Sequence, residues 1–222
     1  MSQTLTGILW ERGMTAPLIS DAQLARVLDG SPQRRYNLVN RALKAGELRR
    51  VRRGLYVLAR PWRAYDCHPY ALAQRLVPGS YISLETALSH HGWIPEAVHV
   101  TASIVPGTKS SDVEDSELGR FSFHPLATQQ GHFLELVART TINHQTMLLA
   151  EPLRALLDLV CLRKQEWQGL EWLEQGLRIE PEWLRAVTGA QLRTLKLVYK
   201  QKRMQHFLGE LEQALGLELT HD

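Results

Sequence analysis

Four arginines stand within five positions of one short stretch, Leu48-Arg49-Arg50-Val51-Arg52-Arg53-Gly54, which runs on into an apolar segment. Guanidinium groups bind the phosphate oxygens of nucleic acids, and a turn presents them to a duplex without burying them. We therefore predict a phosphate clamp around this turn, made by Arg49, Arg50, Arg52 and Arg53.

A basic helix is predicted directly before this stretch. Ser31 followed by Pro32 is typical of a helix start, and Gly46 supplies the stop. The side chains expected to be buried from the helix over 33–45 are Tyr36, Val39 or Leu38, Leu43 and Ala42. Its predicted DNA contacts are Gln33, Arg34, Arg35, Asn37, Arg41 and Lys44.

Position along this helix gives the predicted contacts different roles. Glutamine and asparagine pair with adenine, and arginine pairs with guanine, at base edges in the major groove. Residues 33–37, near the helix start, are expected to reach bases, whereas Arg41 and Lys44 contact the DNA backbone. Phosphate contacts supply affinity and register but little sequence information.

The first sixty residues follow the plan of a winged helix-turn-helix domain, residues 1–60. Helices are predicted within Thr4–Arg12 and from the capping Ser20 to Leu28. Two runs, 48–51 and 55–58, flank a connection that ends in glycine, which is typical of a hairpin. In this plan the third helix enters the major groove and the hairpin reaches phosphate or the adjacent minor groove.

The charge of the chain is distributed unevenly. The 222 residues carry a net charge of only +3, but residues 1–60 hold eleven Lys and Arg against four Asp and Glu. This segment therefore carries +7 and the remainder −4. A basic module joined to a mildly acidic body indicates that the first part meets a polyanion, and that the second part does something else.

The rest of the chain is interpreted as a linker, residues 61–68, and a larger domain, residues 69–222. Helices are expected over 69–76, over 84–91, from 152 onward with Trp167, Leu170 and Leu173 on the next helix, and as a last long helix from near Ala190. Strands are expected over 97–105, 121–123 and 133–141, with an exposed loop between the first two. The predicted class is therefore α+β, a winged helix-turn-helix followed by a mixed α/β domain ending in helices.

Other polar clusters are weaker candidates for chemistry. The histidines, such as His90 and His91 before Gly92, follow no metal-ligand pattern, and we expect those two to cap or pack at a helix end. A nuclease remains an alternative class, with a carboxylate cluster formed by Asp112, Glu114, Asp115 and Glu117. That cluster falls in the expected loop, and no serine stands in a G-x-S-x-G context, so we predict no catalytic residue, cofactor or metal site.

Three features of the second domain are expected to be structural. Arg154 and Asp158, at i and i+4, are spaced for an ion pair on the surface or inside the domain. Trp167, Trp172 and Trp183 are expected to pack between helices. The last helix either adds phosphate contacts or presents a solvated face through Lys196, Lys200, Lys202 and Arg203.

Cellular location is indicated by what the sequence does not contain. No run approaches the roughly 18 apolar residues of a membrane span, and the amino terminus lacks the pattern of a signal peptide. Cys67 and Cys161 have no CxxC spacing. We therefore expect a reduced, cytoplasmic protein without a membrane partner.

Three ordered segments resemble the AbiEi-type antitoxins, which are described as transcriptional regulators of viral defence systems. The first is GELRRVRRGLYVL (Gly46–Leu58), similar to the family's wing. The second is YISLETALSHHG (Tyr81–Gly92), similar to its helix after the linker. The third is AEPLRALLDL (Ala150–Leu159), similar to its "A-x-P-x-[KR]-A-L-h-D" segment.

This resemblance implies a function. It implies a repressor whose winged helix binds inverted repeats in its own promoter, in double-stranded DNA. It also implies a type IV antitoxin whose second domain counters a nucleotidyltransferase-like toxin without a stable complex, and no enzymatic activity. An orphan regulator that has lost its toxin, and a module that sequesters a protein partner, stay open as alternatives.

Overall fold

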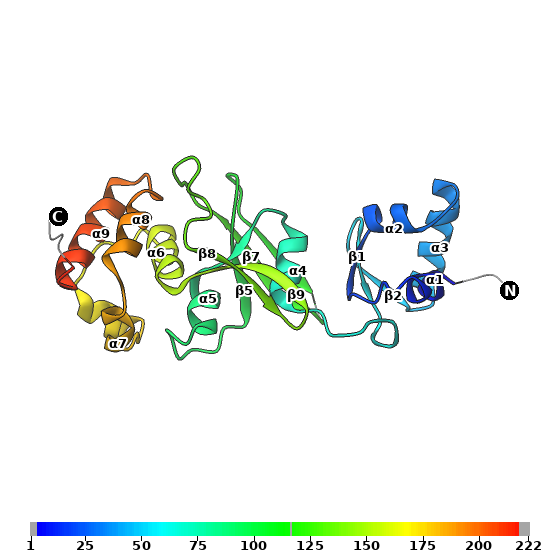
Figure 1. The fold of residues 1–222 in the computed structure, drawn as a ribbon, viewed down its shortest axis with the longest axis horizontal. Helices are drawn as coiled ribbons and strands as arrows, with labels where there is room; N and C mark the ends of the chain where they lie inside the picture. Colours follow the sequence, from blue (N-terminus) through cyan, green and yellow to red (C-terminus); the bar gives the residue numbers. More distant parts are fainter. Residues whose placement is uncertain (1–3, 116, 218–222) are drawn as a thin grey trace. The chain divides into compact units, whose positions relative to one another are not determined.

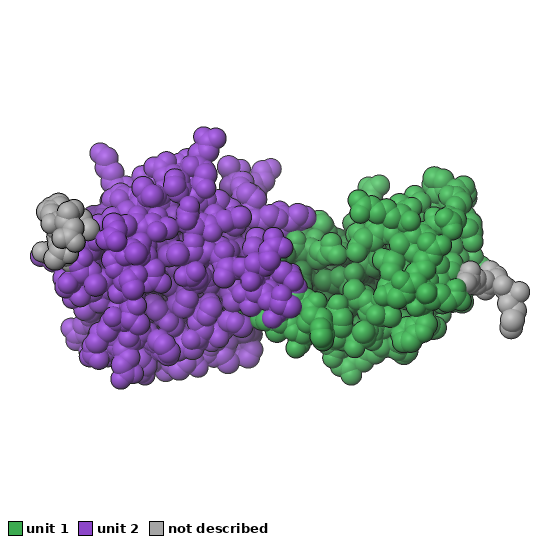
Figure 2. Space-filling view, viewed as in Figure 1, with its two compact units in different colours: residues 1–76, 142–145 green, residues 77–141, 146–222 purple. Residues whose placement is uncertain are grey.

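The protein divides into two compact units, which Figure 2 shows in different colours. The computed structural model describes residues 4–115 and 117–217. The first unit comprises residues 1–76 with 142–145, and the second comprises 77–141 with 146–222. Both combine helices with β-sheet, so the predicted α+β class is confirmed (Figure 1).

Segment 61–68, predicted as a linker, lies inside the first unit. Hydrogen bonds tie it there, since the Ala64 N–H donates to the Thr15 carbonyl at 2.9 Å. The Gln145 side chain also accepts from the His68 N–H at 3.1 Å and donates to the Asp66 carbonyl at 3.0 Å.

Local capping signals start the helices of the first unit. Its elements are α1 (Leu5–Glu11), β1 (Leu18–Ser20), α2 (Asp21–Val27), α3 (Pro32–Lys44), β2 (Leu48–Arg52), β3 (Leu55–Leu58), η1 (Arg60–Trp62) and α4 (Pro69–Leu76). Ser20 and Gln23 form a capping box at α2, and Ser31 accepts from the Arg34 N–H at the start of α3. The predicted helix starts are thereby confirmed.

The predicted hairpin is also confirmed, and it gains a third strand. The sheet order is β1-β3-β2, and both neighbours of β3 are antiparallel to it. Gly54 has φ +76°, the left-handed conformation that the turn requires. The sheet and helices α1–α3 enclose one core, whose members include Leu5, Leu24, Leu38 and Leu58.

One expected core residue of α3 is on the surface. Leu38, Val39 and Ala42 are buried and Leu43 is partly buried, but Tyr36 is 61% exposed. The prediction for Tyr36 was wrong because only a narrow stripe of α3 packs against the core. Tyr36 lies beside that stripe, on the side that faces the hairpin.

The second unit is built on a six-stranded sheet in the order β6-β7-β5-β4-β9-β8. The strands are β4 (Tyr81–Ile82), β5 (Val100–Val105), β6 (Ser111–Asp115), β7 (Gly119–Pro125), β8 (Val137–Ile142) and β9 (Gln145–Ala150). The helices are α5 (Leu84–His90), α6 (Pro152–Leu162), η2 (Trp172–Gly176), α7 (Pro181–Arg185), α8 (Gly189–Lys196) and α9 (Lys202–Ala214). Helix α5 packs on both α6 and β5.

Several predictions for the second unit were wrong, among them the start of the strand expected over 133–141, since β8 begins only at Val137. The segment expected as an exposed loop contains β6, which pairs antiparallel with β7 from Ser111 to Asp115. The expected last long helix is interrupted after Lys196, where Tyr199 is fully buried and pairs with Thr128. The spacing of apolar residues does not by itself predict where a helix is interrupted, because apolar residues continue through the interruption.

Arg154 and Asp158 form the predicted ion pair inside the core, both with fully buried side chains. The Arg154 Nε donates to Asp158 at 2.9 Å, and its other nitrogens donate to the Tyr81 hydroxyl and to two backbone carbonyls. Asp158 also accepts from the hydroxyls of Tyr81, Ser83 and Tyr199 at 2.8–2.9 Å. Burial and the charge of Asp158 raise the pKa of Tyr81 and of Tyr199 well above 10, so both keep the protons that they donate.

Candidate nucleic-acid interface

Helix α3 presents an outer face of exposed polar side chains. Gln33 and Asn37 are exposed one turn apart, and the Gln33 amide donates to the Asn37 side chain at 3.2 Å. Arg34 is exposed but folds back, since its Nη1 donates to the Asp29 carbonyl at 2.6 Å in the turn between α2 and α3. These side chains share the first two turns of the helix.

The end of α3 carries the other two predicted contacts. Lys44 is exposed in the last turn. Arg41 is also exposed, but it borders a small cavity of about 100 Å³ between α1 and α3, together with Thr4 and Glu47. Arg41 therefore lies on the α1 side of the helix.

The four hairpin arginines face three different surroundings. Arg50 is paired with Tyr56 across the sheet, and it faces α3 together with Arg53. Arg49 is half-buried near Cys67, where burial raises the pKa of the thiol and the charge of Arg49 offsets part of that rise. The Arg52 Nη2 donates to the Arg75 carbonyl at the end of α4, at 2.9 Å. The structure thus brings together Arg50 and Arg53, but not all four arginines.

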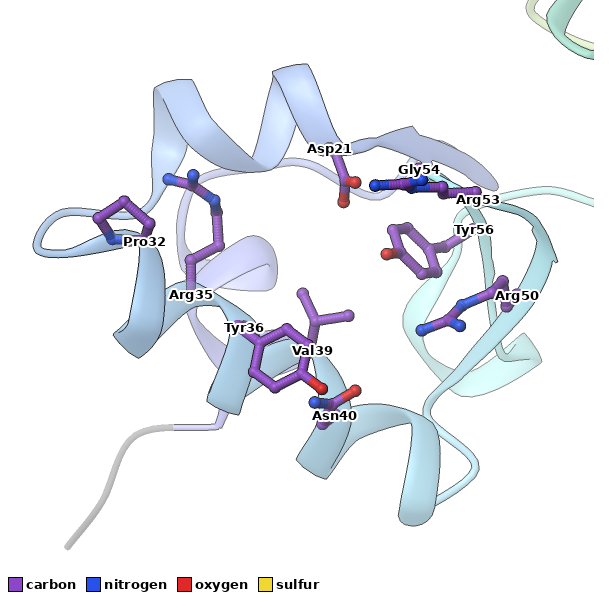
Figure 3. A pocket seen from close by; sticks show the side chains of 10 residues that line it. All are labelled: Asp21, Pro32, Arg35, Tyr36, Val39, Asn40, Arg50, Arg53, Gly54 and Tyr56. Atoms are coloured by element: carbon purple, nitrogen blue, oxygen red, sulfur yellow. The ribbon is translucent and has the colours of Figure 1, made fainter.

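A groove of about 610 Å³ separates α3 from the hairpin (Figure 3). We call it the arginine groove, and its walls are Asp21, Pro32, Arg35, Tyr36, Val39, Asn40, Arg50, Arg53, Gly54 and Tyr56. Figure 3 shows Arg50, Arg53 and Tyr56 directed from the hairpin into this space, with Tyr36 and Asn40 on α3 opposite. Arg35 completes a set of three guanidinium groups from two elements, an arrangement suited to phosphate.

A tyrosine and an aspartate lie among these cations. The guanidinium carbon of Arg50 is 5.9 Å from the centre of the Tyr56 ring. The pKa of Tyr56 is raised by burial, then by the negative charge of Asp21 and a hydrogen bond to it, while Arg50 acts in the opposite direction. Tyr56 therefore stays protonated between a carboxylate and a guanidinium.

Sequence reasoning missed the four polar side chains other than arginine that line this groove: Asp21, Tyr36, Asn40 and Tyr56. Tyr36 and Asn40 are spaced i, i+4 on α3, so the sequence predicts that they lie on the same edge of the helix. That this edge faces the hairpin was not readable, because it depends on how the sheet packs against α3. Asp21 reaches the groove only because the start of α2 is hydrogen-bonded to the hairpin turn.

The residues considered for a nuclease or a metal site make contacts within the second unit. Glu114 accepts from the Arg120 Nε across β6 and β7 at 2.9 Å, and His91 is 2.9 Å from the Ala150 carbonyl. Within residues 4–115 and 117–217, no three His, Cys, Asp or Glu side chains are grouped as metal ligands would be. Over the same residues, no helix has the length and apolar character needed to cross a bilayer.

The tryptophans and the C-terminal cations are only partly as expected. Trp167 packs edge-on against Phe207 with ring centres 5.1 Å apart, but it precedes the π-helical turn η2 rather than lying on a helix, and Trp183 is 42% exposed. Lys196 pairs with Glu212, and Arg203 donates to carbonyls at the end of α6. Lys200 and Lys202 are exposed.

Comparison with known proteins adds no family assignment: neither a protein-family model nor a curated protein matches this chain.

Proposed function

We propose that this protein is a DNA-binding transcriptional repressor whose first unit acts as a winged helix-turn-helix. Three helices followed by a hairpin, with α2 and α3 joined by a short turn, support this proposal. In this arrangement α3 enters the major groove and the hairpin lies over the adjacent DNA backbone or minor groove. Because its target is DNA, we expect the protein to act in the cytoplasm without a catalytic step.

The observation that carries the proposal is the arginine groove beside the polar face of α3. Gln33 and Asn37 offer amide groups of the kind that read adenine, and they lie on the helix that also supplies Arg35. Arg50 and Arg53 offer charge to phosphate from the opposite wall. Side chains suited to reading bases and side chains suited to holding the backbone thus stand next to each other, as sequence-specific binding requires.

We further propose an antitoxin role of the AbiEi type, in which the repressor occludes its own promoter at inverted repeats. The resemblance of three segments supports this part. Two of those segments meet in the buried network, since Tyr81 and Ser83 come from the second and Arg154 and Asp158 from the third. The partner would be a nucleotidyltransferase-like toxin, countered without a stable complex.

The test is binding of the purified protein to its own upstream DNA and to a random duplex across a salt series. We expect a preference of about a thousandfold or more for the upstream DNA, and an affinity that falls steeply with salt. Equal, weak binding to both duplexes would contradict specific repression. The antitoxin role is tested separately, by whether the protein restores growth of cells that express the neighbouring toxin.

A further inference from the structure

Asp21 places a carboxylate on the wall of the arginine groove. Its backbone N–H donates to the Gly54 carbonyl at 3.0 Å, which joins the first residue of α2 to the hairpin turn. Its Oδ2 lies so close to Gly54 that a Cβ there would be 3.2 Å away. Figure 3 shows this carboxylate at the end of the groove where Arg53 and Tyr56 also point.

Helix capping does not account for this carboxylate. The start of α2 is already capped by Ser20, whose Oγ accepts from the Gln23 N–H at 3.3 Å, and by Gln23, which accepts from the Ser20 N–H at 2.9 Å. An acid in the first turn adds a modest interaction with the helix dipole. The Tyr56 hydroxyl is hydrogen-bonded to this side chain, but an amide oxygen would accept the same bond, so the fold does not require the negative charge.

This charge opposes the others that line the groove. Arg35, Arg50 and Arg53 contribute three positive charges, and Asp21 is the one acidic side chain among the ten lining residues. A phosphate that enters meets three attractive groups and one repulsive group. Figure 3 shows the Asp21 carboxylate and the Arg53 guanidinium directed toward each other, so a phosphate that approaches Arg53 competes with Asp21.

The path of a bound duplex brings phosphates to this position. When a helix occupies the major groove and a hairpin the adjacent minor groove, the sugar-phosphate strand between those grooves passes between the helix and the hairpin. In this protein that space is the arginine groove. This step rests on the proposed function.

We propose that Asp21 is a built-in competitor of the DNA backbone, which lowers the affinity of the arginine groove for the phosphates of any duplex. It weakens phosphate contacts, which carry no sequence information, so it lowers the affinity for every duplex by a similar factor and leaves the preference set by the base contacts of α3 unchanged. Asp21 thereby limits the time that the repressor spends on arbitrary DNA, which a genome offers in great excess.

The test compares Asp21→Asn with Asp66→Asn in the full-length protein. Each variant removes one negative charge from the first unit, but Asp66 pairs with Arg60 and Arg63 beyond β3 and does not line the groove. Asparagine has nearly the shape of aspartate and is tolerated at a helix start. Binding is measured on the upstream DNA and on a random duplex, at low and at high salt.

We expect Asp21→Asn to bind both duplexes about fivefold to tenfold more tightly at low salt, since a unit charge at about 4 Å contributes on the order of 1 kcal/mol even in water. This gain in affinity should shrink toward 1 M salt, where the Debye length is about 3 Å and charges farther apart are screened. Asp66→Asn should change affinity less than about twofold. Equal effects of the two variants, or weaker binding by Asp21→Asn, would overturn the proposal.

A thermal melt establishes that Asp21→Asn is folded, and Asp21→Ser replaces it if it is not. DNA binding by the wild-type protein distinguishes a failure of the Asp21 proposal from a failure of the proposed function. If it prefers its upstream DNA but Asp21→Asn behaves like Asp66→Asn, only the role of Asp21 fails. If the wild type binds neither duplex, the proposed function fails, and the role of Asp21 falls with it.

Discussion

Neighbouring arginines of the hairpin serve different surfaces because successive side chains of a strand point to opposite faces. Arg50 is opposite Tyr56 and faces α3, whereas Arg49 is opposite Val57 and lies near Cys67. A register shift after Arg50 then places Arg52 opposite Leu55. A run of arginines in the sequence therefore need not act on one phosphate strand.

This division predicts unequal effects of alanine substitution on DNA binding. Arg50→Ala and Arg53→Ala should each weaken binding to every duplex by about fivefold to tenfold, the loss expected for one charged hydrogen bond at a partly exposed site. Arg49→Ala and Arg52→Ala should have less than half that effect on the binding free energy. Fluorescence anisotropy with a random duplex measures all four, and equal losses would show that the clamp acts as a unit.

Two asparagines of α3 should differ from the hairpin arginines in which property of DNA binding they control. Asn37→Ala, on the outer face, and Asn40→Ala, on the groove edge, should change which base is preferred while leaving binding to random DNA nearly unchanged. A bidentate contact discriminates by about 1–3 kcal/mol per base pair. Binding selection on a randomised operator measures the preference, and an unchanged selected sequence for both variants would exclude base reading by these amides.

The cysteines should be poorly reactive at neutral pH. Burial raises the pKa of Cys67 to about 11 against the opposing charges of Arg63 and Arg49, and burial likewise raises the pKa of Cys161 to about 11. Both are then neutral thiols at pH 8, so iodoacetamide should alkylate them about a hundredfold more slowly than free cysteine, with rates that rise toward pH 11. Mass spectrometry follows the reaction, and unfolding in urea should restore ordinary rates.

Among the elements, α6 carries a buried network of charged and hydroxyl groups. Arg154 and Asp158 connect this helix to β4 through Tyr81 and to the segment after α8 through Tyr199. Every polar group named in this network has a partner. Such a network stabilises one particular packing of α6, because removing one member leaves a buried charge without compensation.

Arg154→Met should therefore cost about 3–5 kcal/mol in the free energy of unfolding. Arg163→Met is the matched control, because Arg163 caps the same helix but pairs with Glu85 at the surface, where an ion pair contributes about 0–1 kcal/mol. Urea unfolding followed by circular dichroism measures both variants. A similar small loss in the two would show that the buried network is not the support of α6.

At the scale of the whole molecule, the charge asymmetry predicts which unit binds phosphate. Each phosphate neutralised adds about 0.9 to the slope of log affinity against log salt. Arg50→Ala/Arg53→Ala should thus lower the slope by about 2, whereas Lys200→Ala/Lys202→Ala, in the second unit, should leave it within about 0.5 of the wild type. A comparable drop in the lysine variant would assign DNA contacts to the C-terminal helices as well.

Features that depend on neighbours in sequence were predictable for this protein. The caps at Ser20 and Ser31, the stop at Gly46 and the hairpin turn at Gly54 involve groups only a few residues apart. The same holds for the ion pair of Arg154 and Asp158, one helical turn apart. These local signals determined the order of helices α1–α3 and the hairpin, the α+β class and the basic character of α3 with its hairpin.

Features that depend on packing were decided only in the tertiary structure. Tyr36 is exposed because its edge of α3 borders the arginine groove, and Asp21 enters that groove from α2. Strand β6 exists because β7 supplies its partner, and the last helix is interrupted where Tyr199 reaches Asp158, 41 residues away in the chain. Periodicity shows which face of an element is apolar, but what lies against each face is determined by elements far apart in the sequence.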